Sequence, residues 1–178
     1  TVWVVKGGEV IPKVVGVVTA ERPQDAEPVT APTVCPICET PVEREPEEVA
    51  LRCPNPVCPA VVAARLRHFV SRGAMGIDGL GDRMLAQLVE AGMVTDEASL
   101  WDLDINAVAE LPGWGETSAT NLLRELDEAR ARPLHRLLFA LGIAHVGERA
   151  ARLLAERFGS LEELAAADPE ALEEIDGI

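Results

Sequence analysis

The chain has 178 residues, 48% of them hydrophobic, and a formal net charge of −14. This length suits one ordinary domain or two to three small modules. No apolar run reaches the ~20 residues of a membrane span, and the absence of a signal-like start favours the cytoplasm. The charge argues at first against nucleic-acid binding, but half of it lies in residues 154–178, where eight carboxylates accompany one arginine.

Residues 2–18 are rich in β-branched residues and are interrupted by Gly7-Gly8, a pattern that predicts two short strands and a turn. Pro12 cannot donate a ladder hydrogen bond, so it marks an edge or a bulge. Because so short a segment cannot form a stable sheet alone, we expect residues 1–20 to end a β-barrel or sheet whose earlier strands are missing. Lys13 is a candidate phosphate contact, with a solvated edge-strand lysine as the equal alternative.

Residues 21–34 contain three prolines among acidic residues and are predicted to be a semi-extended linker. All four cysteines of the chain follow, as the pairs Cys35-Pro-Ile-Cys38 and Cys53-Pro-Asn-Pro-Val-Cys58. The mostly acidic residues 43–48 between the pairs are expected to form the exposed tip of a finger.

The cysteine spacing predicts one structural zinc ion. Zn²⁺ prefers four ligands in a tetrahedron, and closely spaced pairs each supply one edge of it. Two disulfides or four free thiols are the alternatives, and tight pairs without a secretory leader are poor material for disulfides. We therefore predict a zinc finger over residues 35–60, with no open position for a catalytic water. Its predicted ligands are Cys35, Cys38, Cys53 and Cys58.

From residue 61 the apolar pattern becomes helical, and a short motif recurs four times. The copies are Ile77-Asp-Gly79-Leu-Gly81, Leu111-Pro-Gly113-Trp-Gly115, Ile143-Ala-His145-Val-Gly147 and Ile175-Asp-Gly177-Ile178. Their third positions lie 34, 32 and 32 residues apart. Each copy follows an amphipathic segment, and the first three precede another, over residues 82–91, 116–130 and 148–158.

The repeated unit is therefore helix, hairpin, helix, which predicts a mainly α domain over residues 61–178 whose fourth motif is truncated. Terminal signals support these helices. Glycines 92 and 159 fall where helices should end. Ser160–Glu163 has the pattern of a capping box, and Asp168-Pro169 that of a helix start.

A tight hairpin with two glycines directs backbone N–H groups outward at the positive end of the following helix. Such corners bind phosphate without side-chain charge, which explains how an acidic protein can hold DNA. The alternative is that the glycines only allow helices to cross closely; four copies at near-constant spacing favour DNA. The candidate DNA contacts are the hairpin glycines, three nearby arginines and the lysine of the strand segment. They are Gly79, Gly81, Gly113, Gly115, Gly147, Arg65, Arg67, Arg72 and Lys13.

Several side chains near these corners are expected to be structural or to weaken the phosphate site. Trp114 is expected to pack on an adjacent repeat rather than to wedge into DNA. His68 is expected to be a local structural or phosphate contact, not a catalyst. His145 replaces the first glycine of the third motif, which we expect to pack on its neighbour or to bind differently. The acidic residues that follow the glycine pairs compete in part with phosphate.

The chain resembles the C-terminal half of a bacterial NAD⁺-dependent DNA ligase. The segment from Gly7 to Val15 resembles the end of that family's OB-fold domain. The two cysteine pairs resemble its four-cysteine zinc finger. The run from Arg67 through Gly81 resembles the start of its helix-hairpin-helix domain, which has four such motifs.

The resemblance implies that the whole enzyme seals nicks in duplex DNA by adenylating a lysine with NAD⁺ and using Mg²⁺. It implies that this chain holds the nicked duplex while the other domains of the polypeptide bind NAD⁺ and Mg²⁺ and do the chemistry. Neither lysine of the chain begins the Lys-x-Asp-Gly motif of the nucleophile, so we assign no catalytic residue and expect the fragment alone to be inactive, monomeric and cytoplasmic. The alternatives are a non-enzymatic recombination or repair protein and a protein-interaction module.

Overall fold

The computed structural model describes residues 1–8, 11–44, 46 and 49–177. It divides into two compact units, residues 1–33 and 34–178. Parts of three sequence predictions lie outside the described residues: Glu9 in the strand segment, residues 45, 47 and 48 at the acidic fingertip, and Ile178 in the fourth motif.

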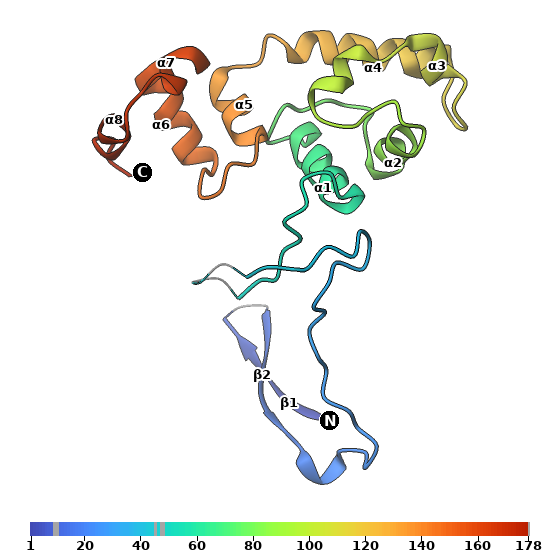
Figure 1. The fold of residues 1–178 in the computed structure, drawn as a ribbon, viewed down its shortest axis with the longest axis vertical. Helices are drawn as coiled ribbons and strands as arrows, with labels where there is room; N and C mark the ends of the chain where they lie inside the picture. The colour runs from blue at the N-terminus through green and yellow to red at the C-terminus, as the bar shows by residue number, and fades with distance from the viewer. Residues whose placement is uncertain (9–10, 45, 47–48, 178) are drawn as a thin grey trace. The chain divides into compact units, whose positions relative to one another are not determined.

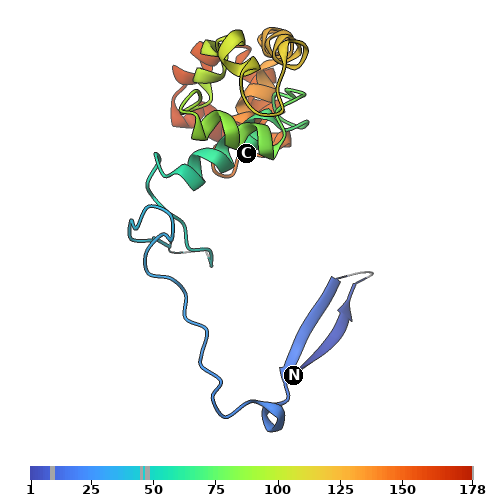
Figure 2. The same cartoon turned by 90° about the vertical axis from the view of Figure 1, so that its right-hand side faces the viewer.

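The first unit contains an antiparallel pair of strands, as the β-branched pattern predicts. Strand β1 (Val2–Gly7) lies beside β2 (Ile11–Val17) in both views of the ribbon (Figures 1 and 2). Pro12 occupies an edge, as every residue of a two-stranded sheet does, and the irregularity in register falls between Trp3 and Val4. No described residue of either strand is buried, so this pair has no core, and its place in a larger barrel stays a prediction.

Between the strands and the cysteines the chain forms little regular structure. One short 3₁₀ helix, η1 (Thr19–Glu21), follows β2. Residues 22–33, all of them described, contain no helix or strand, and their role as a linker stays a prediction. The finger itself is held by two isolated antiparallel bridges, between Val34 and Pro41 and between Glu43 and Arg52.

The rest of the second unit is helical, which confirms the mainly α class (Figure 1). The predicted segments 82–91, 116–130 and 148–158 correspond to α2, α4 and α6 to within one residue at each end. The elements are α1 (Pro59–Val70), α2 (Asp82–Glu90), η2 (Ala98–Asp102), α3 (Ile105–Ala109), α4 (Glu116–Ala129), α5 (Leu134–Ala140), α6 (Glu148–Phe158), α7 (Leu161–Ala165) and α8 (Pro169–Glu173).

Terminal residues fix these helices much as the sequence predicts. Glycines 92 and 159 have φ of +69° and +72° directly after α2 and at the end of α6. The Ser160 hydroxyl accepts the N–H of Glu163 at 3.1 Å, which is one half of the predicted capping box. The Asp168 carboxylate caps α8, whose first residue is Pro169. The caps satisfy backbone N–H groups that the helices leave unpaired.

Two hydrophobic clusters organise the helices into pairs of motifs. The larger cluster joins α1, α2, α3 and α4 through fully buried leucines such as Leu66, Leu88 and Leu122. The smaller one gathers α5 to α8 around Leu154 and Phe158. The first motif therefore packs with the second and the third with the fourth. None of the described helices is long and apolar enough to cross a membrane.

Candidate zinc site and nucleic-acid interface

The structure brings the four predicted metal ligands together. Cys35 and Cys58 are buried, Cys38 and Cys53 are half-buried, and none is in a disulfide. Their four sulfur atoms lie within 4.8 Å of one another. The Sγ–Sγ distances are 3.9 Å between Cys35 and Cys58 and 3.5 Å between Cys38 and Cys53. Tetrahedral zinc with Zn–S bonds of about 2.3 Å separates its sulfurs by about 3.8 Å, so the cluster fits this ion.

The backbone around the cysteines explains how they converge. The carbonyl of Cys35 accepts the N–H of Glu39 at 2.9 Å, and its own N–H donates to Thr40 O at 2.8 Å. Glu39 has φ +58° and makes the tight turn for which glycine is the usual residue. Cys58 is the N-cap of α1, with Pro59 at the first helical position. The last ligand therefore leads directly into the helical domain.

The charges of the cysteine cluster also call for a cation. The side-chain hydroxyl and backbone N–H of Thr40 lower the pKa of Cys38 to about 6. The pKa of Cys53 is raised to about 12: the backbone N–H of Asn55 lowers it, but burial and the neighbouring thiols raise it more. Without a cation, one member of this pair ionises readily only while the other keeps its proton. A bound dication lets all the sulfurs ionise, because metal binding drives off thiol protons.

The recurring motif is also a recurring backbone geometry. Its third residue lies in the left-handed region in all four copies, with φ of +91° at Gly79, +85° at Gly113, +66° at His145 and +97° at Gly177. In the second motif the N–H of Trp114 closes a turn onto the carbonyl of Leu111 at 3.0 Å. His145 is exposed, and the expectation that the third motif packs on its neighbour or binds differently stays a prediction.

The second glycine of each of the first three motifs is the N-cap of the following helix. Gly81, Gly115 and Gly147 are extended, with φ of −70°, −165° and −81°, values open to any residue. Apart from its chain neighbours, each has no heavy atom within 4 Å of the position that a Cβ would take. Neither conformation nor packing within the chain therefore requires glycine here. Gly113 differs, because a Cβ there would lie 3.2 Å from Nη2 of Arg83.

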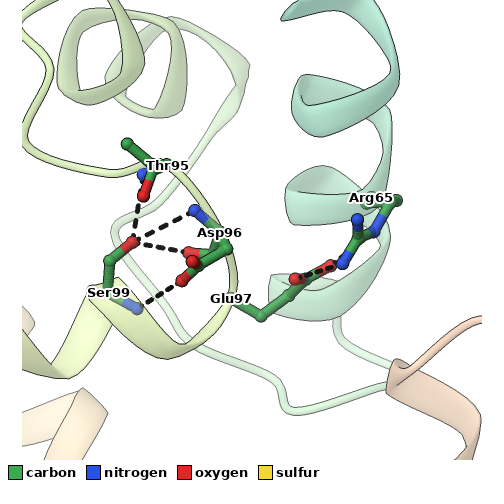
Figure 3. Close-up of polar contacts among 5 residues, drawn as sticks. All are labelled: Arg65, Thr95, Asp96, Glu97 and Ser99. Atoms are coloured by element: carbon green, nitrogen blue, oxygen red, sulfur yellow. Dashed lines mark hydrogen bonds and ion pairs between the residues drawn. The ribbon is translucent and has the colours of Figure 1, made fainter. Parts of the chain in front are cut away.

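Two of the three predicted arginines are already paired with carboxylates. Arg65 on α1 forms a two-pronged contact with Glu97, with N–O distances of 3.0 and 2.6 Å (Figure 3). Arg67 contacts Asp82 at 2.6 Å. Arg72 is exposed, and among the described residues it has no carboxylate within 4 Å. Lys13 is exposed on β2. The DNA contacts of these three arginines and of Lys13 stay predictions. Of the three arginines, Arg72 is the one whose charge no carboxylate of the described residues neutralises.

The loop that holds Glu97 is fixed by its own polar contacts (Figure 3). The Asp96 carboxylate accepts the N–H of Ser99 at 2.8 Å, and the Ser99 hydroxyl accepts the N–H groups of Thr95 and Asp96 at 3.0 and 3.2 Å. The Ser99 backbone N–H, ahead of the smaller effect of Arg65, lowers the pKa of the Asp96 carboxyl. This network presents Glu97 to Arg65 and ties the loop to α1.

Two side chains singled out in the sequence turn out to be structural. Nε2 of His68 lies 2.8 Å from the carbonyl of Phe139, and its ring meets the Phe139 ring edge-on, with centroids 4.8 Å apart. Trp114 donates from Nε1 to Oε1 of Gln87 at 3.3 Å. Gln87 in turn donates to the carbonyl of Pro112 at 2.8 Å. Trp114 thus packs on the first repeat, as expected.

The sequence did not reveal the role of Arg136. Its guanidinium donates to the carbonyl of Ala74 at 2.5 Å and to that of Arg72, so α5 of the third motif is tied to the loop of the first. The contacts span 62 and 64 residues. An arginine in an amphipathic helix carries no local sign of so distant a partner.

Comparison with known families gives the same order of modules. The NAD-dependent DNA ligase C4 zinc finger domain matches residues 34–60. A SAM-like helix-hairpin-helix tandem matches residues 72–128, and a helix-hairpin-helix motif matches residues 136–178.

Similarity to curated proteins extends over essentially the whole chain. A DNA ligase of Symbiobacterium thermophilum is 48% identical over 100% of this chain. One of Latilactobacillus sakei is 47% identical over 100%, and one of Lysinibacillus sphaericus is 45% identical over 97%. The chain therefore contains the C4 zinc finger of NAD-dependent DNA ligases followed by helix-hairpin-helix modules, and it is similar to DNA ligases over its length.

The chain spans 26–27% of the length of these three relatives. The zinc finger match begins one residue before the first cysteine and ends just inside α1. The chemistry of the cysteine cluster and the family match agree on a structural zinc ion held by the finger.

Proposed function

We propose that this segment binds duplex DNA around a nick for a ligase whose adenylation chemistry is done by other domains of the polypeptide. The kinship supports a DNA ligase segment. It also supports NAD⁺ and Mg²⁺ as cofactors bound outside the segment. The segment acts as a monomeric positioning module and is inactive by itself. Holding the broken ends in line is a contribution to rate in its own right.

The observation that carries this proposal is the open space around the N-cap glycines. Gly81, Gly115 and Gly147 each precede a helix of nine residues or more, at the positive end of its dipole. A side chain is compatible with their backbone and their surroundings, yet each position has none. Bare backbone here lets a phosphate approach the first N–H groups of the helix closely. The glycines thus suit an external ligand better than helix crossing.

The hairpins contact phosphates and carry no sequence readout. Backbone N–H groups bind phosphate oxygens irrespective of the bases. We therefore expect binding that depends on duplex geometry. Nicked duplex should be preferred, because the duplex segments on the two sides of a nick can change their relative orientation and each fit one pair of motifs. The motifs pair through two hydrophobic clusters that meet at α5, which presents the hairpins in two groups.

The test is a titration of zinc-loaded protein with nicked duplex, intact duplex and single strand at two salt concentrations. Gly81→Val and Gly147→Val place a side chain on the proposed phosphate path without strain, since φ is −70° and −81°. We expect the double variant to keep its fold and zinc and to bind duplex more weakly, with an unchanged salt slope because no cationic side chain is lost. Ala166→Val, an exposed position after α7, is the matched control.

Equal binding by the double glycine variant and the control would overturn the hairpin mechanism. Failure of the zinc-loaded protein to bind any of the three DNA forms would overturn the whole proposal and favour a protein-interaction module instead. Circular dichroism and zinc content, measured on each variant, separate loss of binding from loss of fold.

A further inference from the structure

A small pocket lies at the junction between the first and third motifs, with a volume of about 250 Å³. It is formed by the loop after α1 and by residues of α5 and α6. Three of the seven lining residues are arginines, and one is a carboxylate. The lining residues are Arg72, Gly73, His135, Arg136, Phe139, Glu148 and Arg152.

The cations of this pocket are not neutralised by the protein. Within the part of the chain that the structure describes, neither Arg72 nor Arg152 has a carboxylate within 4 Å, and Glu148 makes no ion pair. Four other arginines do have carboxylate partners: Arg65, Arg67, Arg124 and Arg130. In a chain of net charge −14, carboxylates are plentiful, so cations that gather without one are available to an external anion.

The walls of the pocket are held in place by specific contacts. Arg136 is fixed by the carbonyls of Ala74 and Arg72, which leaves the loop after α1 held against α5. A Cβ at Gly73 would lie 3.2 Å from Oε1 of Glu148 and 3.6 Å from the Phe139 ring. Glycine at this position therefore keeps the wall of the pocket open.

We infer that this pocket binds a phosphate group of the duplex backbone, between the two pairs of hairpins. Guanidinium groups match the oxygens of phosphate, and their planar forks hold it more specifically than a point charge does. This inference rests on the proposed function and adds a side-chain phosphate site to the backbone sites of the hairpins. Free phosphate has the same chemistry, and the experiment distinguishes the two sources.

The decisive variant is Arg152→Gln, compared with Arg157→Gln on the same helix. Both side chains are exposed arginines, but Arg157 lies over the Phe158 ring and outside the pocket. We expect Arg152→Gln to weaken duplex binding several-fold and to reduce the slope of log affinity against log salt by about one. Arg157→Gln should leave both unchanged.

The imidazole NMR signal of His135, which also lines the pocket, reports the occupant. We expect it to shift with duplex at concentrations where inorganic phosphate has no effect, and this shift should be absent in Arg152→Gln. A shift with inorganic phosphate but none with duplex would overturn the inference. If Arg152→Gln binds duplex like the unchanged protein while the double glycine variant does not, the pocket is refuted and the proposed function stands. No duplex binding by the unchanged protein refutes both.

Discussion

Removing zinc is the perturbation whose effect follows most directly from the cysteine geometry. At the Sγ–Sγ distance of 3.9 Å, the thiolates of the buried pair Cys35 and Cys58 repel without a metal by about 4 kcal/mol at an effective dielectric constant of about 20. Cys38 and Cys53, at 3.5 Å, repel each other as well. The metal-free cluster must therefore take up protons or separate. Structural zinc binds finger peptides with about 10–16 kcal/mol at pH 7, more than enough to hold the cluster closed.

The damage should be confined to the finger. Neither hydrophobic cluster of described residues includes a cysteine, whereas the Cys35 and Glu39 backbone contacts lie within the cysteine turn. We expect about one zinc per chain, as four thiolates around a single ion require. After chelation, the amide signals of residues 34–58 should lose their dispersion while the helical circular dichroism stays nearly constant. Cys38→Ala should behave like the chelated protein.

Thr40→Val is the control, because it removes a hydroxyl next to Cys38 and leaves all four ligands in place. It should retain zinc. Reduced native protein without zinc, or chelated protein whose Cys35 and Glu39 amides stay protected from hydrogen exchange, would refute the reasoning. Unfolding of the helices together with the finger would show instead that α1 depends on its metal-bound N-cap.

Two further substitutions test contacts in the helical domain. Arg136→Met should lower the free energy of unfolding by about 2–3 kcal/mol in a urea titration, because it leaves two carbonyls without a charged donor; Arg157→Gln, with no such partners among the described residues, should change it little. Asp96→Ala should cost about 1 kcal/mol at neutral pH through loss of its contact with the Ser99 N–H. Because folding lowers the pKa of Asp96 from 3.8, this contribution is complete above that pH and is lost as the pH falls through the lower folded value. A difference between Asp96→Ala and the unchanged protein that persists at the acid end would contradict this assignment.

The features that the sequence predicted are those with a local or periodic signal. The glycine spacing of 34, 32 and 32 residues predicted the four corners, three of which have glycine at positive φ. Amphipathic periodicity located α2, α4 and α6, and the cysteine pairs located the metal site. In each case a few adjacent residues determine the geometry, so neighbouring positions carry the information.

The features that the sequence did not predict depend on distant partners. Arg65 meets Glu97 across 32 residues, and Arg136 meets the carbonyl of Ala74 across 62. Which arginines remain unpaired is decided only when the helices pack. The exposure of His145, at a corner with φ of +66°, is likewise a feature that the sequence did not predict.

The distribution of paired and unpaired charge also determines how the proposed DNA binding should respond to salt. The slope of log affinity against log salt reports how many phosphates are neutralised by cationic side chains, and each such contact adds about 0.9 to it. Backbone N–H groups hold phosphate without adding a cation. Among the described residues of the helical domain, five arginines near the hairpins or the pocket have no carboxylate partner: Arg72, Arg83, Arg136, Arg149 and Arg152. If Lys13 does not contribute, the slope of log affinity against log salt in the duplex titration should therefore not exceed about five, even where more phosphates are touched. A steeper slope would mean that Arg65 and Arg67 leave Glu97 and Asp82 to bind DNA.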